Sequence, residues 1–135
     1  MKKRILISTG GTGGHIMPAL SLYEHLSEDH EIFLVTDKRG SKFINKNEYN
    51  HEIFFSPRLE LNIIKLPITL VLFFYSLFKA VLMLKKKKIE IFIGLGGYMS
   101  FTTCLAAKIL NRKIYIFEPN LVIGKANKFL LKFCN

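Results

Sequence analysis

A glycine-rich segment near the start of the chain, STGGTGGHIMP at residues 8–18, holds the residues best suited to chemistry. Clustered glycines let the backbone approach a ligand closely, and ahead of a helix their N–H groups form a cradle for an anion. His15 directly follows the glycines, and imidazole gains and loses a proton near neutral pH. Residues 10–15 therefore predict a diphosphate site with a proton acceptor beside it.

The spacing of these glycines excludes two common nucleotide motifs. No Gly-Lys-Ser or Gly-Lys-Thr ending follows them, and a third glycine is missing from the Rossmann dinucleotide position. Nucleotide hydrolysis and hydride transfer therefore lose support, and no cofactor is expected. No metal is expected either, because Cys104 and Cys134 lack metal-ligand spacing. Both are expected to be buried free thiols, as in a reducing cytosol.

The overall composition predicts one folded domain with an anionic partner. The chain has 135 residues, of which 50% are hydrophobic, and a net charge of +10. That charge suits nucleic acid, a phosphorylated ligand or an acidic membrane surface. A nucleic-acid module needs exposed stacking aromatics, whereas the phenylalanines here lie in apolar runs, so nucleic acid is not an expected partner. The first apolar run is short, and no signal peptide is expected.

Strand and helix signals alternate along the chain and predict an α/β fold with a doubly wound, Rossmann-like parallel sheet. Strands are expected at residues 4–9, 30–37, 51–55, 89–93 and within 112–120. Helices are expected with Pro18 in a first turn, at 42–46, at 66–84, across 102–110 and across 125–133. The carboxyl ends of such strands share one rim. The glycine turns at 10–14 and 94–97, with Glu118 and Asn120, should therefore converge on one cleft.

Residues 66–84 form an apolar run that contains a single charge, Lys79, and precedes a lysine run. Three interpretations stay open: a buried crossover helix, a helix whose excess apolar surface enters a membrane interface, and a membrane span. Lys65, Thr69, Ser76, Lys79 and Lys86 are expected on one polar stripe, which would place Lys79 in the hydrocarbon of a span. The lysine run slightly favours the interfacial interpretation.

Three segments in this order, GGTGGHIMP, GLGGYMS and FEPNLVIGKANKFL, closely resemble the amino-terminal half of the MurG family. These N-acetylglucosaminyltransferases make the second lipid intermediate of peptidoglycan. The resemblance covers residues 4–135 and implies the acceptor-side domain of a GT-B glycosyltransferase, which has two Rossmann-like domains. The donor-binding carboxy-terminal domain of the family has no counterpart in these 135 residues. The chain alone is therefore expected to form half of a cleft.

The resemblance also implies roles for individual residues. His15 matches a proposed catalytic base and Glu118 a second acidic cleft residue, although this chain has Phe117-Glu118-Pro119-Asn120 where typical members have His-Glu-x-Asn. The glycine turns would hold the diphosphate of undecaprenyl-diphosphate-linked N-acetylmuramyl-pentapeptide, in a cleft that UDP-N-acetylglucosamine also reaches. The residues expected to bind these substrates are Gly10, Gly11, Thr12, Gly13, Gly14, Gly96, Gly97, Tyr98, Ser100 and Asn120.

The apolar run falls where the family carries its membrane-association patch. Contact with an anionic membrane surface is expected from Leu72, Phe73, Phe74, Leu77 and Phe78. The implied location is peripheral, on the cytoplasmic face of the bacterial inner membrane.

Two enzymatic hypotheses remain open. The chain is either a MurG-type domain that is truncated and inactive alone, or the membrane-anchoring subunit of a two-component glycosyltransferase with a separate carboxy-terminal half. An inverting transfer deprotonates the acceptor hydroxyl and stabilises the departing UDP. His15 and Glu118 at one rim suit the first task. The sequence offers no clear group for the second.

Overall fold

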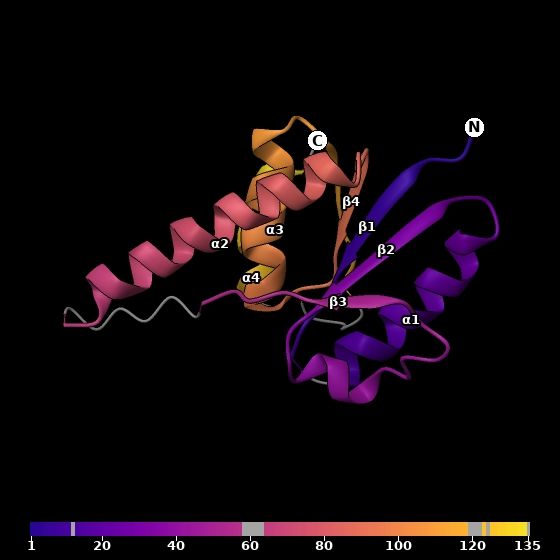
Figure 1. Cartoon of the computed structure of the whole chain (residues 1–135), viewed down its shortest axis with the longest axis horizontal. Helices are drawn as coiled ribbons and strands as arrows, with labels where there is room; N and C mark the ends of the chain where they lie inside the picture. The colour runs from indigo at the N-terminus through magenta and orange to yellow at the C-terminus, as the bar shows by residue number, and fades with distance from the viewer. Residues whose placement is uncertain (12, 58–63, 119–122, 124, 135) are drawn as a thin grey trace.

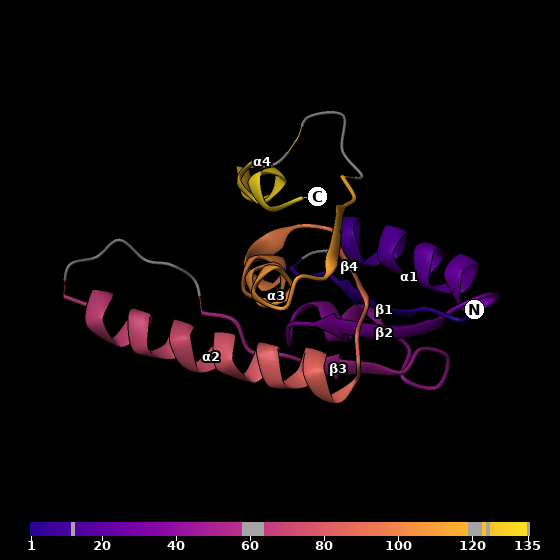
Figure 2. The same cartoon turned by 90° about the horizontal axis from the view of Figure 1, so that it is seen from above.

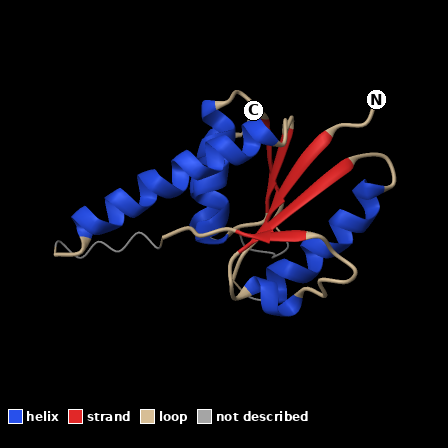
Figure 3. Cartoon of the chain, viewed as in Figure 1, coloured by secondary structure: helices blue, strands red, loops and turns tan. Residues whose placement is uncertain are grey.

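The chain folds into a five-stranded, fully parallel β-sheet with helices on both faces (Figures 1 and 3). The computed structural model describes residues 1–11, 13–57, 64–118, 123 and 125–134. In space the strands follow the order β3-β2-β1-β4-β5. This order confirms the doubly wound, Rossmann-like sheet predicted from the sequence. The strands are β1 (Arg4–Ser8), β2 (Glu31–Thr36), β3 (His51–Ile53), β4 (Ile91–Gly94) and β5 (Lys113–Ile116).

The central strand shows how the sequence fills both faces of the sheet. Side chains alternate along a strand, so Ile5 and Ile7 pack in one core while Leu6 packs in the other. Helix α1 (Gly13–Ser27) covers the first face, and α2 (Leu66–Lys86) and α3 (Gly97–Ile109) cover the second (Figure 2). Helix α4 (Lys125–Leu130) packs beside α3 and continues into the short 3-10 helix η2 (Leu131–Phe133).

Helix α1 begins at Gly13, which is earlier than the expected first-turn position of Pro18 allows. Pro18 was expected in the first turn, but it is the sixth residue of a helix that starts at Gly13. A proline inside a helix removes the N–H that would bond four residues back, and here that partner is the carbonyl of Gly14 in the first turn. The early start places Gly13, Gly14 and His15 in the first turn of α1.

Helix α2 turns its small polar residues inward, contrary to the expected polar stripe. Thr69 and Ser76 are buried with Phe73, Ala80 and Leu84 on the side that packs against α3. The Ser76 hydroxyl donates a 2.6 Å hydrogen bond to the carbonyl of Phe55, which satisfies its polar atom inside the domain. Lys79, on the same expected stripe, is exposed, with its ammonium 4.8 Å from the centre of the Tyr75 ring.

Several element boundaries also differ from the sequence-based expectation. The helix expected at 42–46 is the 3-10 turn η1 (Gly40–Phe43), and β3 ends at Ile53 rather than Phe55.

Cys104 is a buried free thiol, as predicted, whereas Cys134 is only half-buried. Burial, with a smaller contribution from the nearby Cys134, raises the pKa of Cys104 to about 12, which keeps this thiol protonated and unreactive.

Candidate functional site

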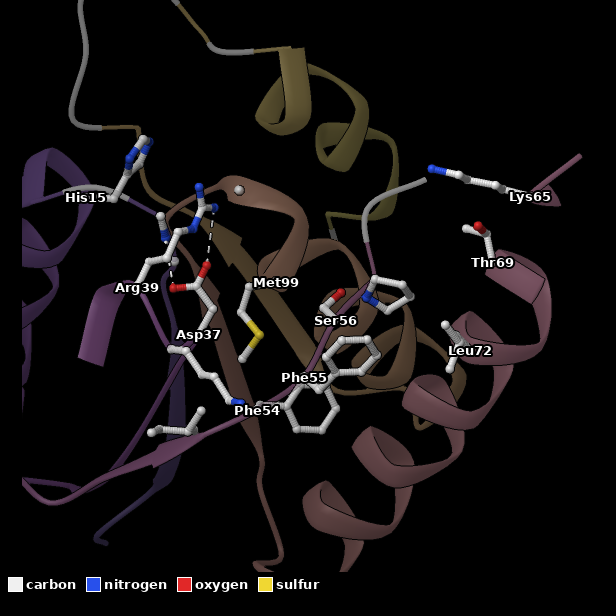
Figure 4. Close-up of a pocket in the computed structure, with 16 residues that line it drawn as sticks. His15, Asp37, Arg39, Phe54, Phe55, Ser56, Lys65, Thr69, Leu72 and Met99 are labelled. Atoms are coloured by element: carbon white, nitrogen blue, oxygen red, sulfur yellow. Dashed lines mark hydrogen bonds and ion pairs between the residues drawn. The ribbon is translucent and has the colours of Figure 1, made fainter. Parts of the chain in front are cut away.

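The carboxyl ends of β1, β2 and β4 open onto a cleft of about 920 Å³ (Figure 4). Both predicted glycine turns reach it, because Gly10 and Gly11 follow β1 and Gly97 follows β4. The two turns lie close together: a side chain at Gly10 would place its Cβ 3.0 Å from the Cβ of Met99. The parallel topology thus brings together two turns that lie far apart in sequence.

The cleft combines cationic side chains with an apolar wall. Lys38, Arg39 and Lys65 line it together with His15, and Asp37 is the one carboxylate among the lining residues that the structure describes. The wall comes from the end of β3 and the segment after it, from α2 and from the first turn of α3. Its apolar members are Ile53, Phe54, Phe55, Pro57, Leu72 and Met99. A ligand that fits this lining is negatively charged at one end and apolar at the other.

His15 lies in the first turn of α1 on one side of the cleft, and Lys65, Thr69 and Leu72 lie on the other (Figure 4). The hydroxyl of Thr9 donates a 3.1 Å hydrogen bond to the His15 carbonyl and so ties this turn to the end of β1. The Nδ1 atom of His15 is shielded from solvent, and no described residue hydrogen-bonds it. The neutral imidazole has a second ring nitrogen, Nε2, which can accept a proton when Nδ1 carries the N–H.

The second glycine turn is held by backbone conformation and by Ser100. Gly96 has φ +104° and caps the start of α3. The Ser100 hydroxyl lies within 2.8 Å of the Gly96 carbonyl and 2.9 Å of the Ser8 carbonyl. Ser100 is fully buried. We therefore correct its expected role from substrate contact to support of the turn.

Replacing Gly96 with alanine should destabilise the domain by about 1–2 kcal/mol, because an L-residue is strained at positive φ. The new methyl would also lie 3.1 Å from the Asn127 Oδ1 atom. Gly13→Ala is the matched control, since Gly13 has no positive φ and its Cβ would meet only the Phe43 ring at 3.9 Å. Urea unfolding measures both costs, and equal costs would contradict this account of the turn.

Asp37, which the sequence analysis did not single out, joins the first glycine turn to the end of β2. Its Oδ1 accepts hydrogen bonds from the Gly40 N–H at 2.7 Å and the Gly11 N–H at 3.3 Å. Its Oδ2 lies 3.4 Å from an Arg39 guanidinium nitrogen. Burial acts to raise the pKa of Asp37, but these hydrogen bonds and the Arg39 charge outweigh it and lower the pKa. The available signal was positional: Asp37 directly follows a strand.

Glu118 follows β5 but is not among the described residues that line the cleft. Its carboxylate accepts a 2.9 Å hydrogen bond from the Asn127 side chain on α4. Asn127 is itself buried beside Gly96. Glu118 is therefore connected to the second glycine turn through Asn127.

The remaining predicted positions divide into three groups. Thr12 and Asn120 lie outside the described residues, and Tyr98 is placed only as part of the α3 backbone. Gly13 and Gly14 form the start of α1 next to the cleft. Of the expected membrane contacts, Leu72, Phe74 and Phe78 are exposed and Leu77 is half-buried, but Phe73 is only 9% exposed and packs against Phe101. Phe73 is therefore corrected to a core residue.

The fold is that of the N-terminal domain of a GT-B type glycosyltransferase. The crystal structure of MurG from Acinetobacter baumannii superimposes with a TM-score of 0.81 at 24% identity and covers 98% of this chain and 40% of that chain. A glycosyltransferase from Rickettsia africae superimposes with a TM-score of 0.69 at 17% identity, covering 97% and 35%.

The sequence matches the model of the glycosyltransferase family 28 N-terminal domain over residues 5–135, and the chain belongs to this family. The curated N-acetylglucosamine transferase of Pelagibacter ubique, which acts on N-acetylmuramyl-(pentapeptide) pyrophosphoryl-undecaprenol, is 45% identical over 134 residues. The corresponding protein of Wolbachia pipientis from Culex pipiens is 38% identical over 129 residues. The match to the first relative includes 99% of this chain but only 38% of that relative. The match to the second includes 95% of this chain and 35% of that relative.

Proposed function

We propose that the chain is the acceptor-side domain of an N-acetylglucosaminyltransferase of peptidoglycan synthesis. Its acceptor would be undecaprenyl-diphosphate-linked N-acetylmuramyl-pentapeptide and its donor UDP-N-acetylglucosamine. The observation that carries the proposal is the cleft in which two glycine turns, three cationic side chains and His15 face an apolar wall. This lining matches a lipid diphosphate that bears a sugar.

Each part of that acceptor has a complementary part of the cleft. Backbone N–H groups at the start of a helix and nearby cations stabilise a diphosphate, which fits Gly13 and Gly14 at the start of α1 together with Arg39 and Lys65. The first isoprenoid units would lie on Phe55 and Leu72. The sugar hydroxyl would then lie near His15, whose ring accepts its proton as the oxygen attacks the anomeric carbon of the donor.

Donor binding is assigned mainly to a part of the enzyme that these 135 residues do not include. The chain spans just over a third of the length of the curated relatives, and its cleft opens at the rim where a second Rossmann-like domain faces the first in a GT-B enzyme. Stabilisation of the UDP leaving group belongs to that second domain, whether it is carried by the same polypeptide or by another. Glu118 remains a candidate for a supporting role, through Asn127.

Helix α2 supports a peripheral membrane location. It is long and apolar enough to cross a bilayer, yet only 22% of its most apolar 18-residue window is buried inside the domain. Thr69 in its first turn lines the cleft, while the Lys87 carbonyl just beyond its last turn accepts a 3.3 Å hydrogen bond from Arg4. Both ends therefore contact one folded unit. An orientation along the membrane surface satisfies this arrangement, whereas a span would place the two ends on opposite sides of the bilayer.

Charge at the carboxyl end of α2 favours an anionic surface. Lys85 and Lys88 line a shallow pocket with Lys2, Arg4 and Arg112, and Glu90 provides the one carboxylate among its described lining residues. Basic residues near a negatively charged leaflet each contribute about 1 kcal/mol of attraction. The proposed site of action is accordingly the cytoplasmic face of the bacterial inner membrane.

Equilibrium binding to the isolated chain tests this proposal. The purified chain should bind the fluorescently labelled lipid-linked muramyl-pentapeptide in detergent micelles, and unlabelled undecaprenyl diphosphate should compete. UDP-N-acetylglucosamine should compete at least about 10-fold more weakly, since most donor contacts are assigned to the second domain. If the chain bound the sugar nucleotide but did not bind the lipid, the assignment of this domain to the acceptor would be contradicted.

A further inference from the structure

Asp37 has the contacts of a residue that organises other groups. Three donors converge on its carboxylate: two backbone amides, from Gly11 and Gly40, and the guanidinium of Arg39. The Gly40 contact is short at 2.7 Å, and the Gly11 and Arg39 contacts are longer at 3.3 and 3.4 Å. The Asp37 side chain is 27% exposed, so it lies at the base of the cleft mouth and not on the open surface.

Arg39 extends from this carboxylate across the first glycine turn. A Cβ placed on Gly11 would lie 3.9 Å from a guanidinium nitrogen of Arg39. A guanidinium carries five N–H donors in a planar fork, and Asp37 accepts from one of its nitrogens. The Arg39 side chain is 55% exposed and lines the cleft, so its other donors face the space where an anion would bind.

We propose that Arg39 is the guanidinium ligand of the acceptor diphosphate and that Asp37 is a positioning residue that holds both Arg39 and the Gly11 turn for it. This inference rests on the proposed function, because it takes the cleft to be a diphosphate site. A planar guanidinium suits two adjacent phosphate oxygens. The Asp37 carboxylate, itself held by the Gly11 and Gly40 amides, fixes the guanidinium before the ligand arrives, which lowers the ordering cost of binding.

The sign of the Asp37→Asn effect separates positioning from simple charge. By Coulomb's law alone, removing a negative charge beside a diphosphate should strengthen binding. If Asp37 acts by positioning, Asp37→Asn weakens binding although it removes that repulsion, because Asn no longer pairs with the guanidinium. Positioning through Arg39 further predicts that the two effects do not add, since residues in one network show coupled energies.

The test is calorimetric titration of the purified 135-residue chain with inorganic pyrophosphate in metal-free buffer. We expect Arg39→Ala to weaken binding about 10-fold, as for loss of a charge-assisted hydrogen bond, and Asp37→Asn to weaken it about 5-fold. The double variant should bind within about 2-fold of Arg39→Ala alone. Glu31→Gln is the matched control: it breaks a 2.8 Å ion pair with Arg4 at the opposite end of the same strand and should leave affinity unchanged.

Contrary results overturn the inference in distinguishable ways. Equal or tighter binding by a folded Asp37→Asn chain, or effects that multiply in the double variant, would overturn the positioning role and leave the proposed diphosphate site intact. Absence of pyrophosphate binding by the unmodified chain would overturn that site and the inference together. Should thermal melting show Asp37→Asn to be unfolded, Arg39→Lys decides: it keeps the charge without the planar fork, and unchanged affinity would overturn the role of Arg39.

Discussion

Replacing His15 with alanine should reduce sugar transfer by about 100- to 10,000-fold, the range that positioned general bases contribute. The reaction is measured with the chain supplemented by a donor-binding domain. The imidazole lines the cleft from the first turn of α1, and its Nδ1 is shielded without a hydrogen-bond partner among the described residues. Removing it takes away the proton acceptor and leaves the glycine turns and the apolar wall in place. Acceptor affinity should therefore change by less than about 3-fold, which is within 1 kcal/mol.

His25→Ala provides the matched control for this variant. His25 lies on the same helix, ten residues further along, and is exposed in its last turn. The same substitution there should leave transfer unchanged. If the His15 variant keeps more than a tenth of the activity while folding normally, a different group removes the proton. Glu118 would then be the next residue to replace, by glutamine.

Introducing charge on the exposed face of α2 should abolish membrane binding. Phe74 and Phe78 are each 62% exposed, and one helical turn separates them. Burying a phenylalanine side chain in the membrane contributes about 1.5–3 kcal/mol to the binding free energy, so losing two of them costs at least about 3 kcal/mol. The variant Phe74→Asp/Phe78→Asp should bind vesicles of phosphatidylglycerol and phosphatidylcholine at least about 100-fold more weakly in a sedimentation assay.

A second double variant separates this local effect from the change in net charge. Phe43 and Ile109 are exposed to nearly the same degree, 57% and 56%, but lie on other elements. Phe43→Asp/Ile109→Asp alters the net charge equally and should lower binding only by the small general loss of electrostatic attraction. Equal losses in the two variants would mean that charge, and not α2, holds the domain on the membrane. Binding by the unmodified chain should also weaken as salt is raised.

The convergence of the two glycine turns could be predicted from sequence because topology alone determines it. Once strands and helices alternate, the segments that follow strands must share a rim, and Gly10 and Gly97 duly meet there. The inward face of α2 could not be predicted in the same way. Helical spacing places Thr69 and Ser76 on a polar stripe and so predicts that they face solvent, yet each is buried. The cost of burying the Ser76 hydroxyl is offset by its hydrogen bond to the Phe55 carbonyl, in the loop after β3.

Local chemistry shows the same limit at Pro18 and Asp37. Proline usually marks a first turn, but α1 accommodates Pro18 further inside and so includes the end of the glycine turn in the helix. The contacts of Asp37 depend on how the loop after β2 folds back toward Gly11 and Gly40. No spacing rule encodes that loop. The position of Asp37 directly after a strand was the one sequence feature that could have identified this residue.

The most direct test of the central claim is complementation of transfer. The chain would be mixed with the separately expressed carboxy-terminal part of the Pelagibacter ubique relative, beyond the 38% of its length that this chain matches. Radiolabelled UDP-N-acetylglucosamine and the lipid-linked muramyl-pentapeptide are supplied in detergent, with the intact relative as the positive control. We predict labelled lipid product from the mixture and none from either part alone. No product from two folded parts, under conditions where the intact relative turns over, would contradict the assignment of this chain as a competent acceptor domain.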